Sequence, residues 1–198
     1  MKDIESISTI INDILKQKLS LLPQKSLTKI QDEVPNKYIF NLHRNGSNNY
    51  IGICVDNHNN KITPTGEWLY VVTIEDPCNV IMISQSDINS LLLSSSFIGV
   101  VGIGHSSLTR KGIELKEQNR MYIKERARIA NRFNRKGGCY AIDVYLAGEI
   151  LFNDFGQIVN WNNNSGHYKI SKEVSMVNIP APVKHILPIE LFTSYNIN

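Results

Sequence analysis

The sequence predicts an α+β domain with an antiparallel-rich sheet, and three observations predict it. Short apolar segments alternate with turns that contain Asn, Asp, Gly or Pro, a pattern typical of hairpin-connected strands. Residues 3–20 and 116–134 instead carry apolar side chains at helical spacing. The 198 residues contain no internal repeat and no linker, which favours a single domain. We expect an N-terminal helical appendage over 1–24, a core over 36–170 and an extended tail over 171–198.

The composition is that of a globular protein that needs no covalent or metal cross-links. Hydrophobic residues make up 42% and charged residues 20%, and a chain of this length can bury a core. The net charge of +3 does not by itself indicate a nucleic-acid partner. Cys54, Cys78 and Cys139 are widely spaced and odd in number, which argues against a disulfide framework and a CxxC metal site. We therefore expect no metal, and a reducing cytosol where the protein acts.

The sequence shows no membrane or export signal. No apolar run approaches the roughly 20 residues that span a bilayer, so we expect no transmembrane segment. Residues 1–9 lack the charged and apolar regions of a Sec-type signal. The chain is predicted to be cytoplasmic, or an effector that is secreted without such a signal and acts in the cytosol of a target cell.

Residues 3–20 are predicted to form an amphipathic helix that ends at Leu21-Leu22-Pro23, because proline cannot continue a helix. The apolar stripe of this helix consists of Ile4, Ile7, Ile10, Ile11, Ile14 and Leu15. The helix either covers one face of the core or forms an appendage that binds a partner or a chaperone.

Two hairpins and a short helix are expected next. The four strands are Tyr38–Leu42, Tyr50–Val55, Trp68–Ile74 and Val80–Ser84, with turns at Asp56–Asn60 and Glu75-Asp76-Pro77. Asp87–Leu93 is predicted as a helix with Ser86 as its N-cap, because Asp87 then lies in the first turn. Phe97–Ile103 returns to strand.

One long basic helix is predicted before the last hairpin. Lys116–Asn134 has helical periodicity, and Gly137-Gly138 ends it. Tyr140–Leu146 alternates in the manner of a strand. The tail contains Pro180, Pro182 and Pro188 and is therefore expected to be an extended loop.

The functional chemistry is expected to gather in a hairpin between Ala147 and Tyr168. Glu149 stands just before its first strand, and Asn153–Gly156 forms the turn. A polar cluster follows the second strand. Closing the hairpin would bring the carboxylate to the hydroxyl, the imidazole and the phenol of this cluster, which belong to Ser165, His167 and Tyr168.

A second polar cluster, Gly102–Ser107, comes at the end of a predicted strand. Its glycines allow the backbone to approach another group closely. His105, Ser106 and Ser107 could bind a phosphate or orient a nucleophile, or a serine could merely cap the next element. His167 likewise is either an acid or base near neutral pH or a packed turn residue.

Positive charge is concentrated between Arg110 and Lys136, where ten of the 21 basic residues lie against three glutamates. This segment is either a solvated helix face or a surface for an acidic protein, an anionic membrane or a calmodulin-like groove. Nucleic acid is not expected, because only Tyr122 and Phe133 are aromatic among these charges. The candidate partner-binding residues are Arg120, Lys124, Arg126, Arg128 and Arg132.

Four short motifs resemble a known domain pattern: HSSL at 105–108, AGEI at 147–150, Gly156, and NNSGHY at 163–168. The pattern is similar to C-terminal domains of some bacterial polymorphic toxins and effectors, and to the core of plant IQ-motif-containing calmodulin-binding proteins. It covers roughly residues 66–170. The chain departs from the pattern in the long segment between the first two motifs and in lacking a proline after SGHY. It also lacks an IQ motif, so calmodulin binding does not carry over.

Our first hypothesis is a bacterial effector or toxin enzyme that modifies a protein. Its most concrete version is an NAD-dependent mono-ADP-ribosyltransferase-like activity. His43 or Arg44, together with a serine of the HSS motif, would contact the diphosphate, and Glu149 would stabilise the oxocarbenium-like ribose or orient the acceptor. The candidate catalytic residues are Glu149, His167 and His105, and the candidate binding residues are Arg44, Ser106, Ser107, Ser165 and Tyr168.

Two alternatives stay open. Cys139 with His105 or His167 would be typical of a hydrolase or acyl transferase, although a lone cysteine beside a strand is commonly a small core residue. The chain could instead be a binding module without catalysis. Its HSS and SGHY clusters would then be structural turns, and the basic helix 116–136 would recognise the partner.

Overall fold

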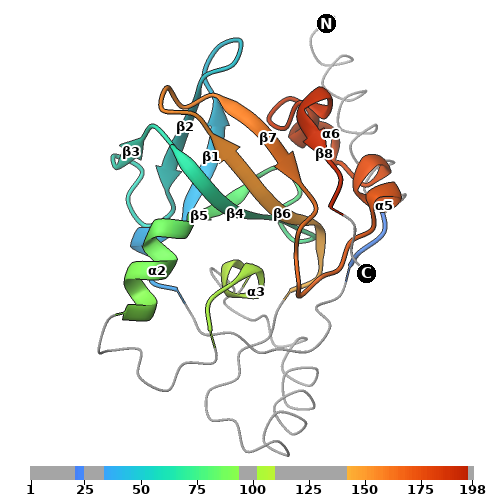
Figure 1. The fold of residues 1–198 in the computed structure, drawn as a ribbon, viewed down its shortest axis with the longest axis horizontal. Coiled ribbons are helices and arrows are strands. Elements are labelled where there is room, and N and C mark those ends of the chain that lie inside the picture. The colour runs from blue at the N-terminus through green and yellow to red at the C-terminus, as the bar shows by residue number, and fades with distance from the viewer. Residues whose placement is uncertain (1–20, 25–33, 94–101, 110–141, 196–198) are drawn as a thin grey trace, which may run out of the picture.

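A computed structural model describes residues 21–24, 34–93, 102–109 and 142–195, and the structural statements below concern these ranges. They contain one eight-stranded sheet with short helices around it (Figure 1). The strands are β1 (Phe40–Arg44), β2 (Tyr50–Cys54), β3 (Lys61–Ile62), β4 (Gly66–Thr73), β5 (Ile81–Ser84), β6 (Val144–Phe152), β7 (Ile158–Asn162) and β8 (Phe192–Thr193). The helices are η1 (Asn36–Tyr38), α2 (Gln85–Leu93), α3 (His105–Leu108), α5 (Lys172–Val177), α6 (Ala181–Lys184) and η4 (Ile189–Leu191).

The strand order across the sheet is β3-β2-β1-β5-β4-β6-β7-β8. All neighbouring strands pair antiparallel except β7 and β8, which are parallel. The predicted α+β class with an antiparallel-rich sheet is therefore confirmed. β4 and β6 form the longest ladder, which runs from Gly66 opposite Phe152 to Thr73 opposite Val144.

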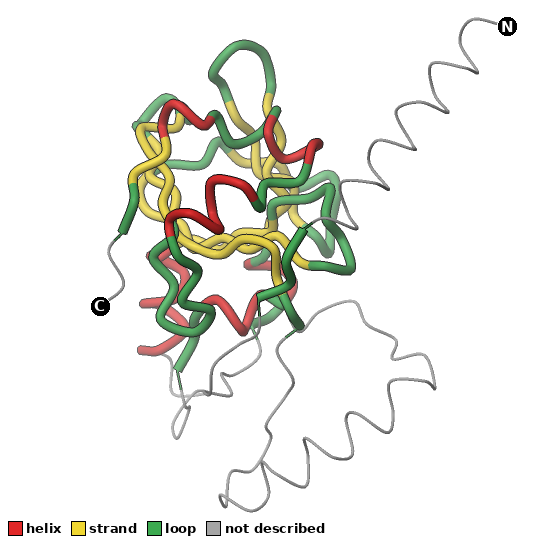
Figure 2. Tube along the Cα trace, turned by 90° about the vertical axis from the view of Figure 1, so that its right-hand side faces the viewer, coloured by secondary structure: helices red, strands yellow, loops and turns green. Residues whose placement is uncertain are grey.

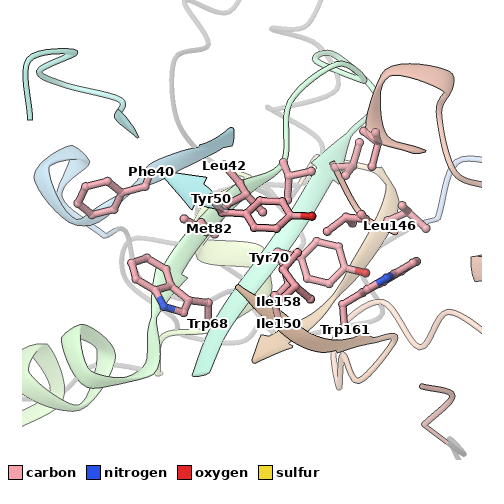
Figure 3. Packing of buried hydrophobic residues seen from close by; sticks show 14 of the residues in the cluster. Phe40, Leu42, Tyr50, Trp68, Tyr70, Met82, Leu146, Ile150, Ile158 and Trp161 are labelled. Carbon is pink, nitrogen blue, oxygen red and sulfur yellow. The ribbon is translucent and has the colours of Figure 1, made fainter. Parts of the chain in front are cut away.

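Each face of the sheet carries its own core, because side chains alternate along a strand. On one face Tyr70 of β4 packs with Trp161 of β7 in an edge-to-face contact (Figure 3). On the other face Leu69 and Ala147 pack with Leu108 of α3. α3 therefore rests on the face to which Ala147 points. Figure 2 shows the short helices in red around the yellow strands of the sheet.

The hairpin predicted between Ala147 and Tyr168 is confirmed, with a longer first strand than expected. β6 runs from Val144 to Phe152, so Glu149 lies within this strand and not just before it. The turn closes through a hydrogen bond of 3.1 Å from Gly156 N to the Asn153 carbonyl oxygen. Gly156 has φ 73°, a conformation that glycine adopts without a steric cost.

The expectation of an extended tail is wrong, because residues 171–193 form two short α-helices, a 3-10 turn and a strand. Pro180 is the N-cap of α6, and Pro182 lies in its first turn, where proline is compatible with a helix. The apolar side chains of this region complete the core that contains Tyr70 and Trp161, which we call the first core. Ile179, Val183 and Leu187 are buried there.

The predicted N-cap of α2 is also wrong. α2 begins at Gln85, and the Oγ of Ser84, not that of Ser86, accepts a hydrogen bond of 3.0 Å from Asp87 N. Ser84 Oγ also donates to the Asp87 carboxylate at 2.6 Å, so the two residues bind each other reciprocally. This pair moves the start of the helix toward β5.

The end of the predicted N-terminal appendage belongs to the domain. Gln24 pairs with Val144 through two backbone hydrogen bonds of 2.7 and 3.0 Å, and Leu21 is buried in the core. The helices predicted at 3–20 and 116–134 lie outside the described residues, as does most of the strand predicted at Phe97–Ile103.

Candidate functional site

The candidate site forms where β7 separates from β6. In the central ladder Gly148 lies opposite Tyr70. A Cβ atom on Gly148 would lie 1.9 Å from the carbonyl oxygen of Asn162, so only glycine allows this approach of two backbones. The same oxygen accepts a hydrogen bond of 3.0 Å from Tyr70 Oη. The motif glycine thus has a structural reason, and it places Asn162 beside Glu149.

Two asparagine amides hold the half-buried Glu149 carboxylate. Its Oε2 accepts from Asn162 Nδ2 at 3.2 Å, and its Oε1 accepts from Asn164 Nδ2 at 2.9 Å. The side-chain oxygen of Asn162 accepts in turn from the backbone N–H groups of Glu149 (3.1 Å) and Asn164 (2.8 Å). Closing the hairpin therefore brings Glu149 to the polar cluster, and neutral donors fix both of its oxygens.

The His105 imidazole joins α3 to the strand that carries Glu149. Its Nε2 lies 2.8 Å from the Gly148 carbonyl oxygen. Burial lowers the pKa of His105 to about 4, the Gly148 hydrogen bond opposes this change, and the nearby His167 adds to it. His105 is therefore neutral at pH 7. Because a carbonyl only accepts, Nε2 carries the proton and Nδ1 keeps the lone pair.

The two serines of the HSS motif face the interior. Ser106 and Ser107 are 1% and 0% exposed. The Oγ of Ser107 accepts from Gly104 N at 3.2 Å, while Ser107 N donates to the Gly104 carbonyl oxygen at 2.9 Å. Ser107 thereby caps the start of α3 rather than a following element.

The phenol of Tyr168 holds together the two ends of the segment 110–141. Tyr168 Oη donates to the Ile142 carbonyl oxygen at 2.9 Å and lies 3.4 Å from Thr109 Oγ1. Thr109 Oγ1 accepts from Ile142 N at 3.1 Å and donates to the Ser106 carbonyl oxygen at 2.9 Å. We call Thr109, Ile142 and Tyr168 the clamp. It joins the HSS and SGHY motifs at the base of the basic segment.

The SGHY motif itself is a tight turn. Ser165 is buried, and its Oγ accepts from Tyr168 N at 3.3 Å. Its carbonyl oxygen accepts from Lys169 N at 2.9 Å. Lys169 has φ 44°, the left-handed conformation that closes such a turn. The turn places His167 near enough to His105 to lower the His105 pKa, and it places the Tyr168 hydroxyl beside Thr109.

Arg44 is not part of this cluster. Its guanidinium donates to the carbonyl oxygens of Ser47 and His185. Phe40 shares a row across the sheet with Gly148, and Arg44 lies four residues farther along β1. That separation is roughly 13 Å along the strand and about 14 Å across three strand spacings. The structure thus places His105 near His167 and in contact with the backbone of Gly148, the residue before Glu149, and it places neither Arg44 nor its neighbour His43 there.

No model of a known protein family matches the chain, and no curated protein or solved structure matches it significantly. Among the described residues, no group of three or more His, Cys, Asp or Glu side chains could hold a metal ion. Within the same ranges no helix is long and apolar enough to cross a bilayer. Cys139 and the candidate partner-binding residues of the basic segment lie outside these ranges.

The sequence interpretation missed the asparagines and the threonine of the site. Asn162 and Asn164 carry the direct contacts to Glu149, and Thr109 stands at the centre of the clamp. The run of three asparagines beside the hairpin's open end was the available signal, because amides there can bind a carboxylate. Thr109 has no comparable signal, since its role depends on where α3 rests.

Proposed function

We propose that the chain is a binding module that joins the two ends of its basic segment, 110–136, at one base and uses this segment to bind an acidic protein. The observation that carries this proposal is the clamp. Thr109 and Ile142 flank the segment, and hydrogen bonds of 2.9–3.1 Å to Tyr168 and between the two residues keep them together. A long insertion with joined ends can vary in its own sequence without disturbing the sheet.

The orientation of the motif side chains supports a structural role for them. Ser107, Ser165 and Tyr168 are each at most 2% exposed and their side chains form hydrogen bonds within the protein, while Ser106 is 1% exposed. The His105 imidazole donates a hydrogen bond to the Gly148 carbonyl oxygen and is neutral at pH 7. The HSS and SGHY motifs then serve to build the base of the segment.

The charge of the segment supports an acidic protein as its partner. Ten basic and three acidic residues give 110–136 a net charge of +7, more than twice the +3 of the whole chain. Such a local charge raises association rates with an anionic surface. Apolar residues at helical spacing among these charges fit a groove that is acidic at its rim and apolar at its floor.

Calcium-loaded calmodulin is a suitable probe, because its groove has this chemistry. We expect the full chain to bind it at physiological salt, and Arg126→Glu/Arg128→Glu/Arg132→Glu to weaken binding by at least about tenfold. The matched control reverses three exposed charges elsewhere, Lys61→Glu/Lys172→Glu/Lys184→Glu, and should bind as wild type. Binding only to phosphatidylserine vesicles, or equal losses in both triple variants, would contradict the proposal.

A second candidate function is the NAD-dependent transferase, with a protein in the cytosol of a target cell as its substrate. The Glu149 carboxylate, which two asparagine amides hold in place, favours it, because a fixed carboxylate can stabilise a developing oxocarbenium ion. The distant Arg44 gives it no diphosphate contact. This function requires NAD consumption that Glu149→Gln abolishes. Loss of activity with Cys139→Ala alone would instead support the hydrolase or acyl transferase.

A further inference from the structure

The first residues that the structure describes are firmly attached beside α5. The Asn178 side-chain amide donates to the Leu22 carbonyl oxygen at 2.9 Å, and its oxygen accepts from Leu22 N at 2.7 Å. Asn178 is the C-cap of α5 and also donates to the Tyr145 carbonyl oxygen at 2.8 Å. Figure 1 shows the blue segment 21–24 next to this helix. The point from which residues 1–20 extend is therefore fixed.

Three exposed apolar residues take part in this attachment or directly precede Asn178 in the chain. Leu22 is 59% exposed, and Met176 and Val177, the two residues before Asn178, are 42% and 72% exposed. We call these three residues the α5 patch. A single exposed apolar side chain needs no explanation. Three of them at one backbone attachment offer an apolar surface to a covering segment.

The segment that precedes Leu21 has the complementary chemistry. Its apolar stripe consists of Ile4, Ile7, Ile10, Ile11, Ile14 and Leu15. Asp, Glu, Lys and Gln occupy the positions between them, so the opposite side of the predicted helix is polar. The connection through Leu21 keeps this stripe near the patch at a local concentration in the millimolar range, which exceeds that of a separate partner.

We propose that residues 3–20 dock on the α5 patch of the same chain, with Ile11, Ile14 and Leu15 covering Met176 and Val177. The segment then belongs to the domain as a cover for α5. It is not a free appendage that waits for a chaperone or another partner.

Hydrogen exchange of the full chain, read by mass spectrometry on peptides within residues 8–18, tests this proposal. We expect Met176→Asp/Val177→Asp to speed exchange there by at least about tenfold, because docking is the source of protection. The control is Leu93→Asp, which changes an 88% exposed apolar residue at the end of α2 and should exchange as wild type. Peptides from β4 and β6 report that each variant stays folded.

Two results would overturn the proposal. Exchange in residues 8–18 that is equally fast in the wild type and the double variant would show that the segment does not dock on α5. Protection that appears only at high protein concentration would assign the patch to the segment of a second copy. Protection that persists at high dilution and is lost in the double variant establishes docking within one chain.

Discussion

The candidate site depends on a position that has no side chain. Gly148 lies so close to Asn162 that the carbonyl oxygen of β7 occupies the place of a β-carbon. This approach brings the Asn162 side chain within hydrogen-bond distance of Glu149. The contact involves backbone atoms, which cannot rotate away as a flexible side chain can.

We expect Gly148→Ala to lower the free energy of unfolding by about 3 kcal/mol, because its methyl group would meet main-chain atoms of Asn162 1.9 and 2.7 Å away. Urea denaturation measures this loss. Gly166→Ala is the matched control, since nothing lies within 4 Å of a Cβ there. If the two variants were equally stable, β7 would have shifted to accommodate the methyl group without a loss in the free energy of unfolding, which would contradict the prediction.

We expect Tyr168→Phe to cost about 1 kcal/mol and to speed the exchange of the Ile142 amide proton, because the clamp loses its phenol. Thermal unfolding and hydrogen exchange measure the two effects. Tyr195→Phe serves as the control, because Tyr195 is 52% exposed and bonds Asn163 through its backbone. The same loss in both variants would argue against a special role for the Tyr168 hydroxyl.

At the residue scale the sequence predicts that Glu149 lies near the polar cluster, but it does not predict which way the serine side chains of the HSS motif point. Hairpin closure alone brings Glu149 to the polar cluster around Asn164. The inward orientation of Ser106 and Ser107 was not predictable, because it depends on α3 packing against β4 and β6 through Leu108. Short motifs do not encode such long-range packing, so buried and exposed serines look alike in a sequence.

At the scale of elements, α3 joins the sheet through a neutral imidazole, which makes its attachment sensitive to acid. The pKa of His105 falls from 6.5 to about 4 on folding, mainly through burial. As the pH falls below 6.5, His105 becomes protonated in the unfolded chain but stays neutral in the folded chain until the pH approaches 4. The stability that His105 contributes is therefore complete above pH 6.5 and is lost as pH falls toward 4.

This contribution amounts to about 3 kcal/mol for a pKa difference of this size. Denaturant titrations between pH 7 and pH 4 should show the loss in the wild type. They should show a shallower dependence in His105→Gln, which retains a donor for the Gly148 carbonyl but does not titrate. An unchanged pH profile in His105→Gln would assign the acid sensitivity to other groups.

The elements differ in how far the sequence could predict them. Strands such as β2 and β4 follow from runs of β-branched and aromatic residues, and the structure confirms them. The sequence does not predict the helices of the tail, because Pro180 and Pro182 are typical of segments that are not helical. In the structure both prolines lie at the start of α6, where proline is compatible with a helix. A proline therefore indicates an end of a helix, and the neighbouring residues determine whether the helix precedes or follows it.

At the scale of the whole molecule, the tail closes one core of the sheet. Ile179, Val183 and Leu187 are at most 2% exposed and pack with residues of β4, β6 and β7. Trp161 Nε1 donates to the Pro188 carbonyl oxygen at 2.7 Å, so the tail also satisfies a buried donor of the sheet. The stability of the sheet therefore depends on the packing of the C-terminal tail.

We therefore expect a chain that ends at residue 170 to lose cooperative thermal unfolding, because the apolar side chains of the first core become exposed. Leu187→Ala offers a milder test in the full chain and should cost about 2–5 kcal/mol. Near-ultraviolet circular dichroism during heating measures both. A truncated chain that melts cooperatively near the wild-type temperature would restore the view of the tail as an extended appendage.

We propose that the motif residues build the base of the basic segment 110–136 and that this segment binds an acidic protein. The most direct test compares the calmodulin affinity of the wild type, Glu149→Gln and Arg126→Glu/Arg128→Glu/Arg132→Glu in one titration series. We predict unchanged affinity for Glu149→Gln and a loss of at least about tenfold for the charge reversal. Full affinity after charge reversal, together with NAD consumption that Glu149→Gln abolishes, would contradict the claim and support the transferase.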